Sequence, residues 1–178
     1  MQANTLSDFR KIIANCQQIF NQKNRDYGTS WRILRLPSIT DQLFIKAMRI
    51  RSIQEKGTQK VADDIKDEFF GIINYSLIAL IQIQLQAETE LKIDPQQLNE
   101  LYSQEVEKNI TLLQNKNHDY NEAWRMMRVS SMTDIILAKL LRIKEIENNE
   151  GKTLISEGVE AGYRDILNYA VFCLILLQ

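Results

Sequence analysis

The sequence is poor in the residues that interrupt regular structure or cross-link it. Its 178 residues include two prolines, six glycines, two cysteines and one histidine. So little proline and glycine argues against a loop-rich or all-β fold. Cys16 and Cys173 lie inside apolar helical runs and provide no disulfide framework, so we expect a protein of the reducing cytoplasm. No Ser-His-Asp, Cys-His, zinc-binding or P-loop pattern is present in the sequence.

An excess of charge of one sign and long apolar runs are also missing. Lysine and arginine number 22 against 23 aspartates and glutamates, a net charge of −1, so there is no strong signal for nucleic-acid binding. The most apolar stretch, residues 166–177, is interrupted by Asn168 and is too short to cross a bilayer. The first 20 residues lack the layout of a signal peptide. We therefore expect a globular protein without a membrane partner.

The main positive feature is an internal repeat. Residues 23–53 align without a gap on residues 116–146 at an offset of 93, and fourteen of the 31 aligned positions are identical. Further along, IINYSLIAL from Ile72 matches ILNYAVFCL from Ile166 at an offset of 94. The chain is therefore a tandem duplication of a unit of about 90 residues, with one residue gained between the two matching blocks.

Hydrophobic spacing predicts three helices in each unit. The predicted fold is all-α: six main helices in one pseudo-twofold bundle, with repeats at 1–88 and 94–178 that share a core. We expect the third helices at about 61–85 and 153–177, and these should be central because their later halves are apolar nearly all round.

Three local patterns predict where the helices begin and end. The first helix of the second unit should begin at Asp94-Pro95, an N-cap followed by proline. The shared Lys-Asn-x-Asp-Tyr motif is expected in a loop after the first helix. The second helix should open with Ser38 and Asp41 as capping residues, and its counterpart with Ser131 and Asp134.

Most of the residues that the two units share are polar. Ten of the fourteen identities are polar or charged, whereas the apolar positions between them drift as a packed core tolerates. One interpretation is structural: a salt-bridge network, with Trp31 and Trp124 anchoring the loops. The other is functional, because lysine and arginine beside aromatic rings suit the phosphates and the base of a nucleotide-like ligand. The polar identities are Lys23, Asn24, Asp26, Arg32, Arg35, Ser38, Thr40, Asp41, Lys46 and Arg49.

Acids and asparagines on the third helix leave alternatives open. Asp119, Glu160 and Asp165 are candidate ligands for Mg²⁺, which prefers carboxylates and phosphate oxygens. If the one-residue shift falls before the third helix, Asp165 is the counterpart of Gly71; if it falls inside, the acid pairs of the two units superpose. Asn74 and Asn168 need partners wherever they are buried, either each other or a ligand.

The chain contains three patterns: Lys-Asn-x-Asp-Tyr-(Gly)-x-x-Trp, then Lys-x-x-Arg-Ile, and a late Asp-x-x-Asn-Tyr. With these patterns the chain resembles the nucleotide modification associated domain 1 family, a family of small helical proteins also called domain of unknown function 1599. The resemblance covers both repeats and implies modified nucleotides as the substrate class, without implying a reaction. A more distant similarity is to all-α nucleoside triphosphate pyrophosphatases, which hold Mg²⁺ with acidic pairs on two helices. Here the second helix carries Lys46 and Arg49 where such a pair is needed.

These observations lead to two functional hypotheses. The first is a protein that binds a nucleotide or related phosphorylated ligand, extending to a Mg²⁺-dependent nucleotide pyrophosphohydrolase. The alternative is a non-catalytic helical interaction or scaffold module. Either is compatible with a homo-oligomer. The expected ligand-binding residues are Lys23, Asn24, Asp26, Tyr27, Arg35, Lys46 and Arg49 in the first unit, and Lys116, Asn117, Asp119, Tyr120, Arg128, Lys139, Arg142, Asn168 and Tyr169 in the second.

Overall fold

The computed structural model describes residues 5–58, 64–120, 122–154 and 157–178, with the backbone alone at 117–120. The described residues form six α-helices and two short 3-10 helices and no strand, in the order α1 (Thr5–Tyr27), η1 (Ser30–Ile33), α2 (Leu36–Lys56), α3 (Ile65–Gln84), α4 (Pro95–Tyr120), η2 (Ala123–Met126), α5 (Val129–Asn148) and α6 (Val159–Leu176). The same succession of elements therefore occurs twice, which confirms the predicted all-α duplication.

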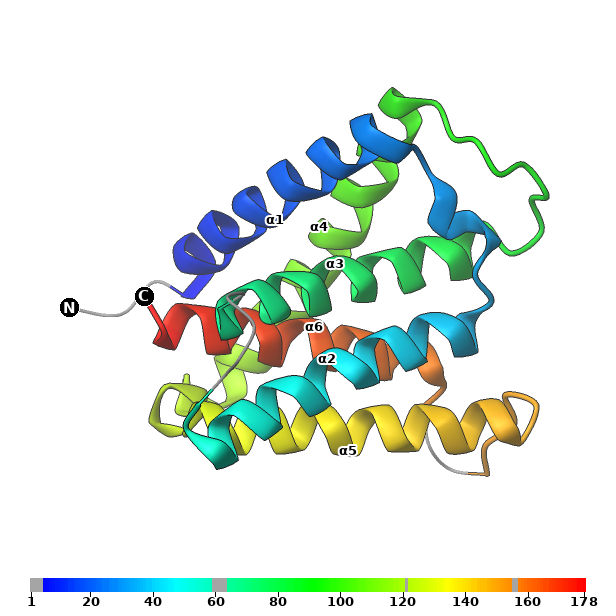
Figure 1. Cartoon of the computed structure of the whole chain (residues 1–178). Coiled ribbons are helices and arrows are strands. Elements are labelled where there is room, and N and C mark those ends of the chain that lie inside the picture. The colour runs from blue at the N-terminus through cyan, green and yellow to red at the C-terminus, as the bar shows by residue number, and fades with distance from the viewer. Residues whose placement is uncertain (1–4, 59–63, 121, 155–156) are drawn as a thin grey trace.

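The helices lie in three layers. The two third helices, α3 and α6, pack side by side in the middle, with α2 and α5 on one side and α1 and α4 on the other (Figure 1). The first helix of each repeat packs against the third helix of the other repeat: α1 contacts α6, and α4 contacts α3. Buried apolar side chains of all six helices form one core. The central position of α3 and α6 follows from their composition, since a helix that is apolar nearly all round must be covered.

The Lys-Asn-x-Asp-Tyr motif is helical, so the expectation of a loop was wrong. In the first repeat α1 continues through the motif to Tyr27, and Gly28 with φ of 65° follows it. The Gly28 N–H donates to the carbonyl oxygen of Asn24 at 2.9 Å. A glycine in the left-handed conformation is a common helix end, and here it lies after the motif. In the second repeat α4 likewise runs to Tyr120.

The predicted starts of the second and third helices also need correction. Helix α2 already begins at Leu36, with Pro37 in its first turn, so Ser38 lies inside the helix and caps nothing. Proline is favoured in a first turn because the missing N–H is not needed there. The third helices begin later than predicted, at Ile65 and Val159.

Other helix starts follow the local chemistry of the sequence. The predicted cap at Asp94 is confirmed, because its Oδ1 accepts the N–H of Gln96 at 2.9 Å and of Gln97 at 3.2 Å. At the start of α3, Asp64 and Asp67 form a reciprocal capping box.

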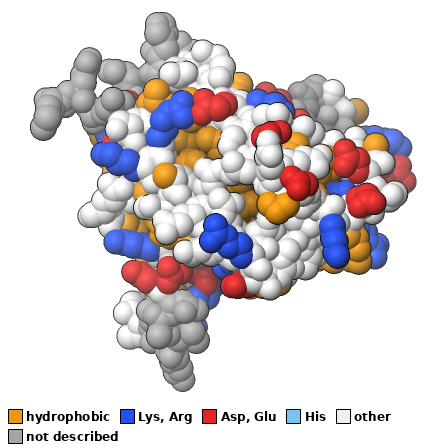
Figure 2. Space-filling view, turned by 90° about the horizontal axis from the view of Figure 1, so that it is seen from above, with side chains coloured by type: hydrophobic (Ala, Val, Ile, Leu, Met, Phe, Trp, Pro, Cys, Tyr) orange, Lys and Arg blue, Asp and Glu red, His pale blue; other side chains and the backbone are white. Residues whose placement is uncertain are grey.

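The surface carries both signs of charge. Seen from the α1 and α4 side, lysine and arginine side chains alternate with acidic ones over this face (Figure 2). This mixture agrees with the net charge of −1. Within the described part of the chain, every helix is too short or too polar to span a membrane.

Candidate functional site

The first repeat contains a cleft where α1, η1, α2 and α3 meet. Its volume is about 590 Å³, within the usual size of small-molecule sites. Helix α1 contributes the residues at its C-terminal end and α2 contributes one lysine. Helix α3 contributes residues from its first turn, where Asp67 and Glu68 lie, to Ile78. The lining residues that the two repeats share are Lys23, Asn24, Tyr27, Trp31, Lys46, Asn74 and Tyr75.

A second cleft of about 440 Å³ occupies the equivalent place in the second repeat. Lys116, Trp124, Asn168 and Tyr169 line it, and they are the counterparts of Lys23, Trp31, Asn74 and Tyr75. The fold therefore brings residues from distant parts of each repeat to one place, and it does so twice.

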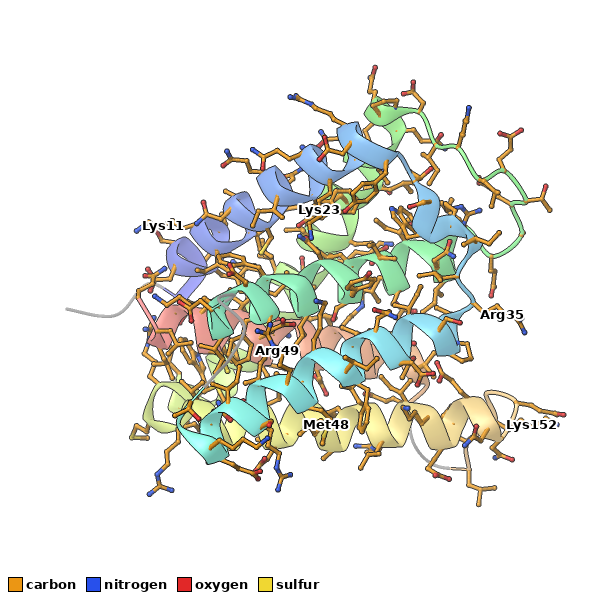
Figure 3. All side chains as sticks on the ribbon, in the orientation of Figure 1. Lys11, Lys23, Arg35, Met48, Arg49 and Lys152 are labelled. Atoms are coloured by element: carbon orange, nitrogen blue, oxygen red, sulfur yellow. The ribbon has the colours of Figure 1, made fainter. Side chains whose placement is uncertain are left out.

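In the first repeat, two of the shared cations are bound to one buried acid. Glu68 accepts from Lys46 Nζ at 3.2 Å and forms an ion pair with Arg49. The ammonium of Lys46 also lies 5.9 Å from the centre of the Tyr75 ring. Lys23 lies between α1 and α3 (Figure 3), and no acid in the described chain pairs with it. The first cleft thus keeps one exposed lysine that is available to a ligand.

In the second repeat, one acid bridges both lysines. Asp165 accepts from Lys116 Nζ at 2.9 Å and from Lys139 Nζ at 2.7 Å. Burial by itself would raise the pKa of Asp165, but the hydrogen bonds and charges of the two lysines outweigh it and lower that pKa. Burial would lower the pKa of Lys116, yet the bond to Asp165 raises it. The site therefore holds an ionised carboxylate between two ammonium groups.

The two repeats exchange an acid and a glycine on the third helix. At the offset of 94, Asp165 corresponds to Gly71 and Gly162 corresponds to Glu68. A β-carbon on Gly71 would lie 2.9 Å from Cε of Lys46, so Lys46 lies against Gly71 as Lys139 lies against Asp165. The one-residue shift therefore falls before the third helix. Sequence reasoning did not place Glu68 in the site; this exchange was the signal that could have found it.

The two third-helix asparagines do not bond each other. Asn74 donates to the carbonyl oxygen of Cys16 at 3.0 Å and accepts from the Tyr102 hydroxyl at 2.9 Å. Asn168 accepts from Asn109 Nδ2 at 2.6 Å. By contrast, the buried Oδ1 of Asn24 in the first cleft has no hydrogen-bond partner among the described residues. A buried acceptor without a donor is uncommon, so Asn24 is suited to bind a ligand N–H or O–H.

The aromatic residues divide into anchors and exposed rings. Trp31 is buried, and Trp124 stacks on Phe172 with 4.2 Å between ring centres, so both tryptophans hold their 3-10 segments against the bundle. Tyr27 is 59% exposed at the mouth of the first cleft. Partial burial, and then the neighbouring Tyr75 and Asp26, raise the pKa of Tyr27. Tyr27 thus keeps its hydroxyl proton and presents a neutral ring.

Several predicted residues lie outside the clefts. Arg35 and Arg128 are exposed at the starts of α2 and α5 and line neither cleft. Arg142 is exposed, outside the second cleft, and has no ion pair within the described chain. Asp26 is exposed at the end of α1. The side chains of Asn117, Asp119 and Tyr120 fall outside the described residues.

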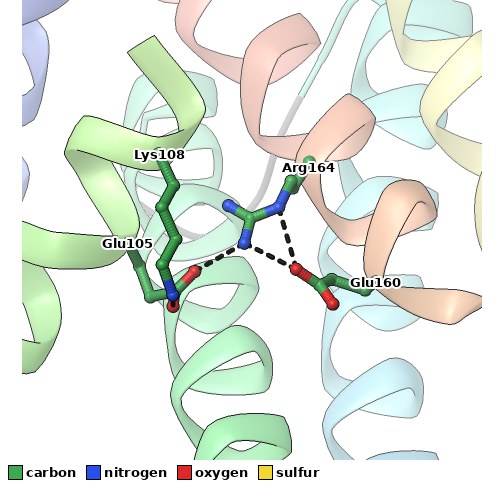
Figure 4. A network of polar contacts seen from close by, with 4 residues as sticks. All are labelled: Glu105, Lys108, Glu160 and Arg164. Carbon is green, nitrogen blue, oxygen red and sulfur yellow. Dashed lines mark hydrogen bonds and ion pairs between the residues drawn. The ribbon is translucent and has the colours of Figure 1, made fainter. Parts of the chain in front are cut away.

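Two of the candidate magnesium ligands, Glu160 and Asp165, pair with cations of the chain, and the side chain of Asp119 falls outside the described residues. Glu160 accepts from Arg164, which also donates to the buried Glu105 (Figure 4). Asp165 belongs to the separate lysine pair described above. Among the side chains that the structure describes, no three His, Cys, Asp or Glu residues are grouped to hold a metal ion. Magnesium binding through Asp119, Glu160 and Asp165 therefore stays a prediction.

Comparison with known proteins identifies one family. The model of the nucleotide modification associated domain 1 family matches the chain twice, at residues 23–83 and 116–177. These segments cover more than half of the chain, which therefore belongs to this family. Neither curated proteins nor solved structures give a significant match. Both family segments contain the lysine, tryptophan, asparagine and tyrosine residues that line the clefts.

Proposed function

From its membership of the nucleotide modification associated domain 1 family and from its clefts, we propose that this protein binds a nucleotide or a closely related phosphorylated molecule. The observation that carries the proposal is the convergence of repeat-shared residues on a cleft of suitable volume. Shared polar residues that served only as local turns or caps would remain near their own chain segments. Here α1, α2 and α3 each deliver one or more of them to the same cavity.

The chemistry of the first cleft matches the parts of a nucleotide. Lys23 supplies a positive charge for a phosphate, as a point charge on a flexible stem. Tyr27 and Tyr75 offer ring faces for a base. The unpaired Oδ1 of Asn24 accepts a base or sugar donor. A ligand held in this way needs no metal ion, and Mg²⁺-dependent pyrophosphate release remains a separate prediction.

A panel of nucleoside mono-, di- and triphosphates, each with and without Mg²⁺, tests the proposal by thermal shift. Ligand at 100 times Kd stabilises the folded state by about 2.7 kcal/mol, which for a chain of this size raises Tm by roughly 5–10 °C. Lys23→Met should abolish the shift. Lys11→Met is the matched control, because Lys11 is exposed on the same helix and lies outside the cleft (Figure 3).

The alternative is a non-catalytic interaction module. It is favoured by the ion pairs of Lys46, Arg49, Lys116 and Lys139, which also lock helices together. The absence of a shift with every nucleotide would reject our proposal in favour of this alternative. A shift that appears only with Mg²⁺ and a triphosphate, followed by pyrophosphate release, would extend the proposal to the hydrolase prediction.

A further inference from the structure

The two clefts differ in where their own carboxylate lies. In the second repeat, Asp165 lies between Lys116 and Lys139 and bonds both. In the first repeat, the corresponding residue is Gly71, which has no side chain. The acid of the first repeat is Glu68, one helical turn earlier, where it binds Lys46 and Arg49 and leaves Lys23 without a carboxylate among the described residues.

The Asp165 carboxylate therefore shows which group this pair of lysines accepts. It is a planar anion whose two oxygens each take one ammonium hydrogen bond, at 2.9 and 2.7 Å. A pair of phosphate oxygens is likewise anionic and accepts hydrogen bonds from ammonium groups. The equivalent lysines of the first repeat, Lys23 and Lys46, line the same cavity. Asp67 and Glu68 line this cavity too, and Glu68 binds Lys46, but no acid in the described chain pairs with Lys23.

We infer that the first repeat is the ligand-binding copy and holds the anionic group of the ligand between Lys23 and Lys46, where the second repeat places its own Asp165 carboxylate. The inference rests on the proposed function and makes it more specific. Gly71 places no competing carboxylate beside Lys46, whose flexible end lies over it, whereas Asp165 occupies the equivalent lysines and excludes the anion by intramolecular competition. Each chain therefore binds one ligand.

The charges of the two repeats support this assignment. Each repeat has three shared cations and one paired acid in this region. In the first repeat the cation left over is Lys23, which lines the cleft. In the second it is Arg142, which lies outside the equivalent cleft. Among the described residues, the shared cation without an acidic partner therefore lines the cleft only in the first repeat.

Titration calorimetry tests the inference with two probes, inorganic pyrophosphate and the nucleotide that gives the largest thermal shift. The wild-type protein should bind one equivalent. Asp165→Gly, which copies the first repeat, should bind two. Gly71→Asp, which copies the second repeat, should weaken binding at least tenfold. The three atoms nearest to a β-carbon at position 71 belong to the flexible end of Lys46, which can shift to the position that Lys139 takes beside Asp165.

The outcomes separate the inference from the proposed function. Two equivalents in the wild type, or one equivalent in both Asp165→Gly and the more conservative Asp165→Asn, would overturn the inference and leave nucleotide binding intact. One equivalent of pyrophosphate with no nucleotide binding would support the anion site and reject the proposed function. Unchanged binding by folded Gly71→Asp or Lys23→Met, with Lys11→Met as the control, would also overturn the inference. Binding of neither probe by the wild type rejects both.

Discussion

The buried ion pair between α4 and α6 allows a quantitative test of how the two repeats differ. Arg164 Nη2 donates to Glu105 Oε2 at 2.7 Å, and the two side chains are 8% and 2% exposed (Figure 4). The corresponding positions of the first repeat hold Phe70 and Ile12. These two positions therefore hold an ion pair in the second repeat and two apolar residues in the first.

We expect each single replacement to be costly. In Glu105→Ile, Arg164 stays buried with only the half-exposed Glu160 as its acid. In Arg164→Phe, Glu105 stays buried with only the exposed Lys108 as its cation. Removing one partner of a buried pair usually costs 3–5 kcal/mol; because one partner remains in each case, we expect about 3 kcal/mol. In a chain of this length that lowers Tm by roughly 6–12 °C.

The double variant Glu105→Ile, Arg164→Phe should be more stable than either single variant. It removes both charges together and installs the residue types that the first repeat uses. Replacing a buried ion pair by packed apolar residues is often neutral or stabilising.

Urea unfolding of the four proteins, followed by circular dichroism, gives the coupling energy directly. An additive loss of about 6 kcal/mol in the double variant would refute the reasoning, because it would mean that the two charges do not compensate each other in the fold.

Three further predictions concern individual contacts. Burial is the main cause of the raised pKa of Glu147, so ionisation of this carboxyl destabilises the fold as the pH rises above the pKa that it has in the unfolded chain. Glu147→Gln should remove this loss and add about 1 kcal/mol to the free energy of unfolding at pH 7. Urea unfolding from pH 4 to 8 measures the difference. The counterpart of Glu147, Gln54, already donates to Thr133 at 3.1 Å. The pKa of Asp165 is lowered, so its contribution is present above about pH 4 and lost in acid; Asp165→Asn should flatten that acid limb in the same assay, and an unchanged limb would contradict it. Asp94→Ala should lower stability by about 1 kcal/mol, because two N–H groups of α4 lose their acceptor. This loss corresponds to a fall in Tm of roughly 2–4 °C, and a Tm within 1 °C of wild type would contradict the cap.

Local signals accounted for much of the fold and part of the site. Helical spacing and the offset of 93 predicted six helices in two repeats because a helix places residues three and four apart on one face. Lys23, Asn24, Tyr27 and Lys46 were predicted as ligand-binding residues because both repeats keep them, and all four line the first cleft. Polar residues that two diverged copies keep can seldom be replaced by other residue types. The predicted helix starts were less accurate. The capping pattern placed the start of α2 at Ser38, but the helix begins at Leu36 with Pro37 in its first turn.

The sequence by itself determined the all-α class, the duplication and the set of polar residues common to both repeats. Only the tertiary structure decided which acid neutralises which cation. Lys139 and Asp165 lie on different helices, as do Lys46 and Glu68, and their contact depends on how α2 and α5 pack against α3 and α6. An ion pair between helices depends on a few ångströms of packing, and hydrophobic periodicity does not encode that distance. For this reason two nearly identical charge patterns form one cleft with a lysine that no described acid pairs with and one whose lysine is paired with its own carboxylate.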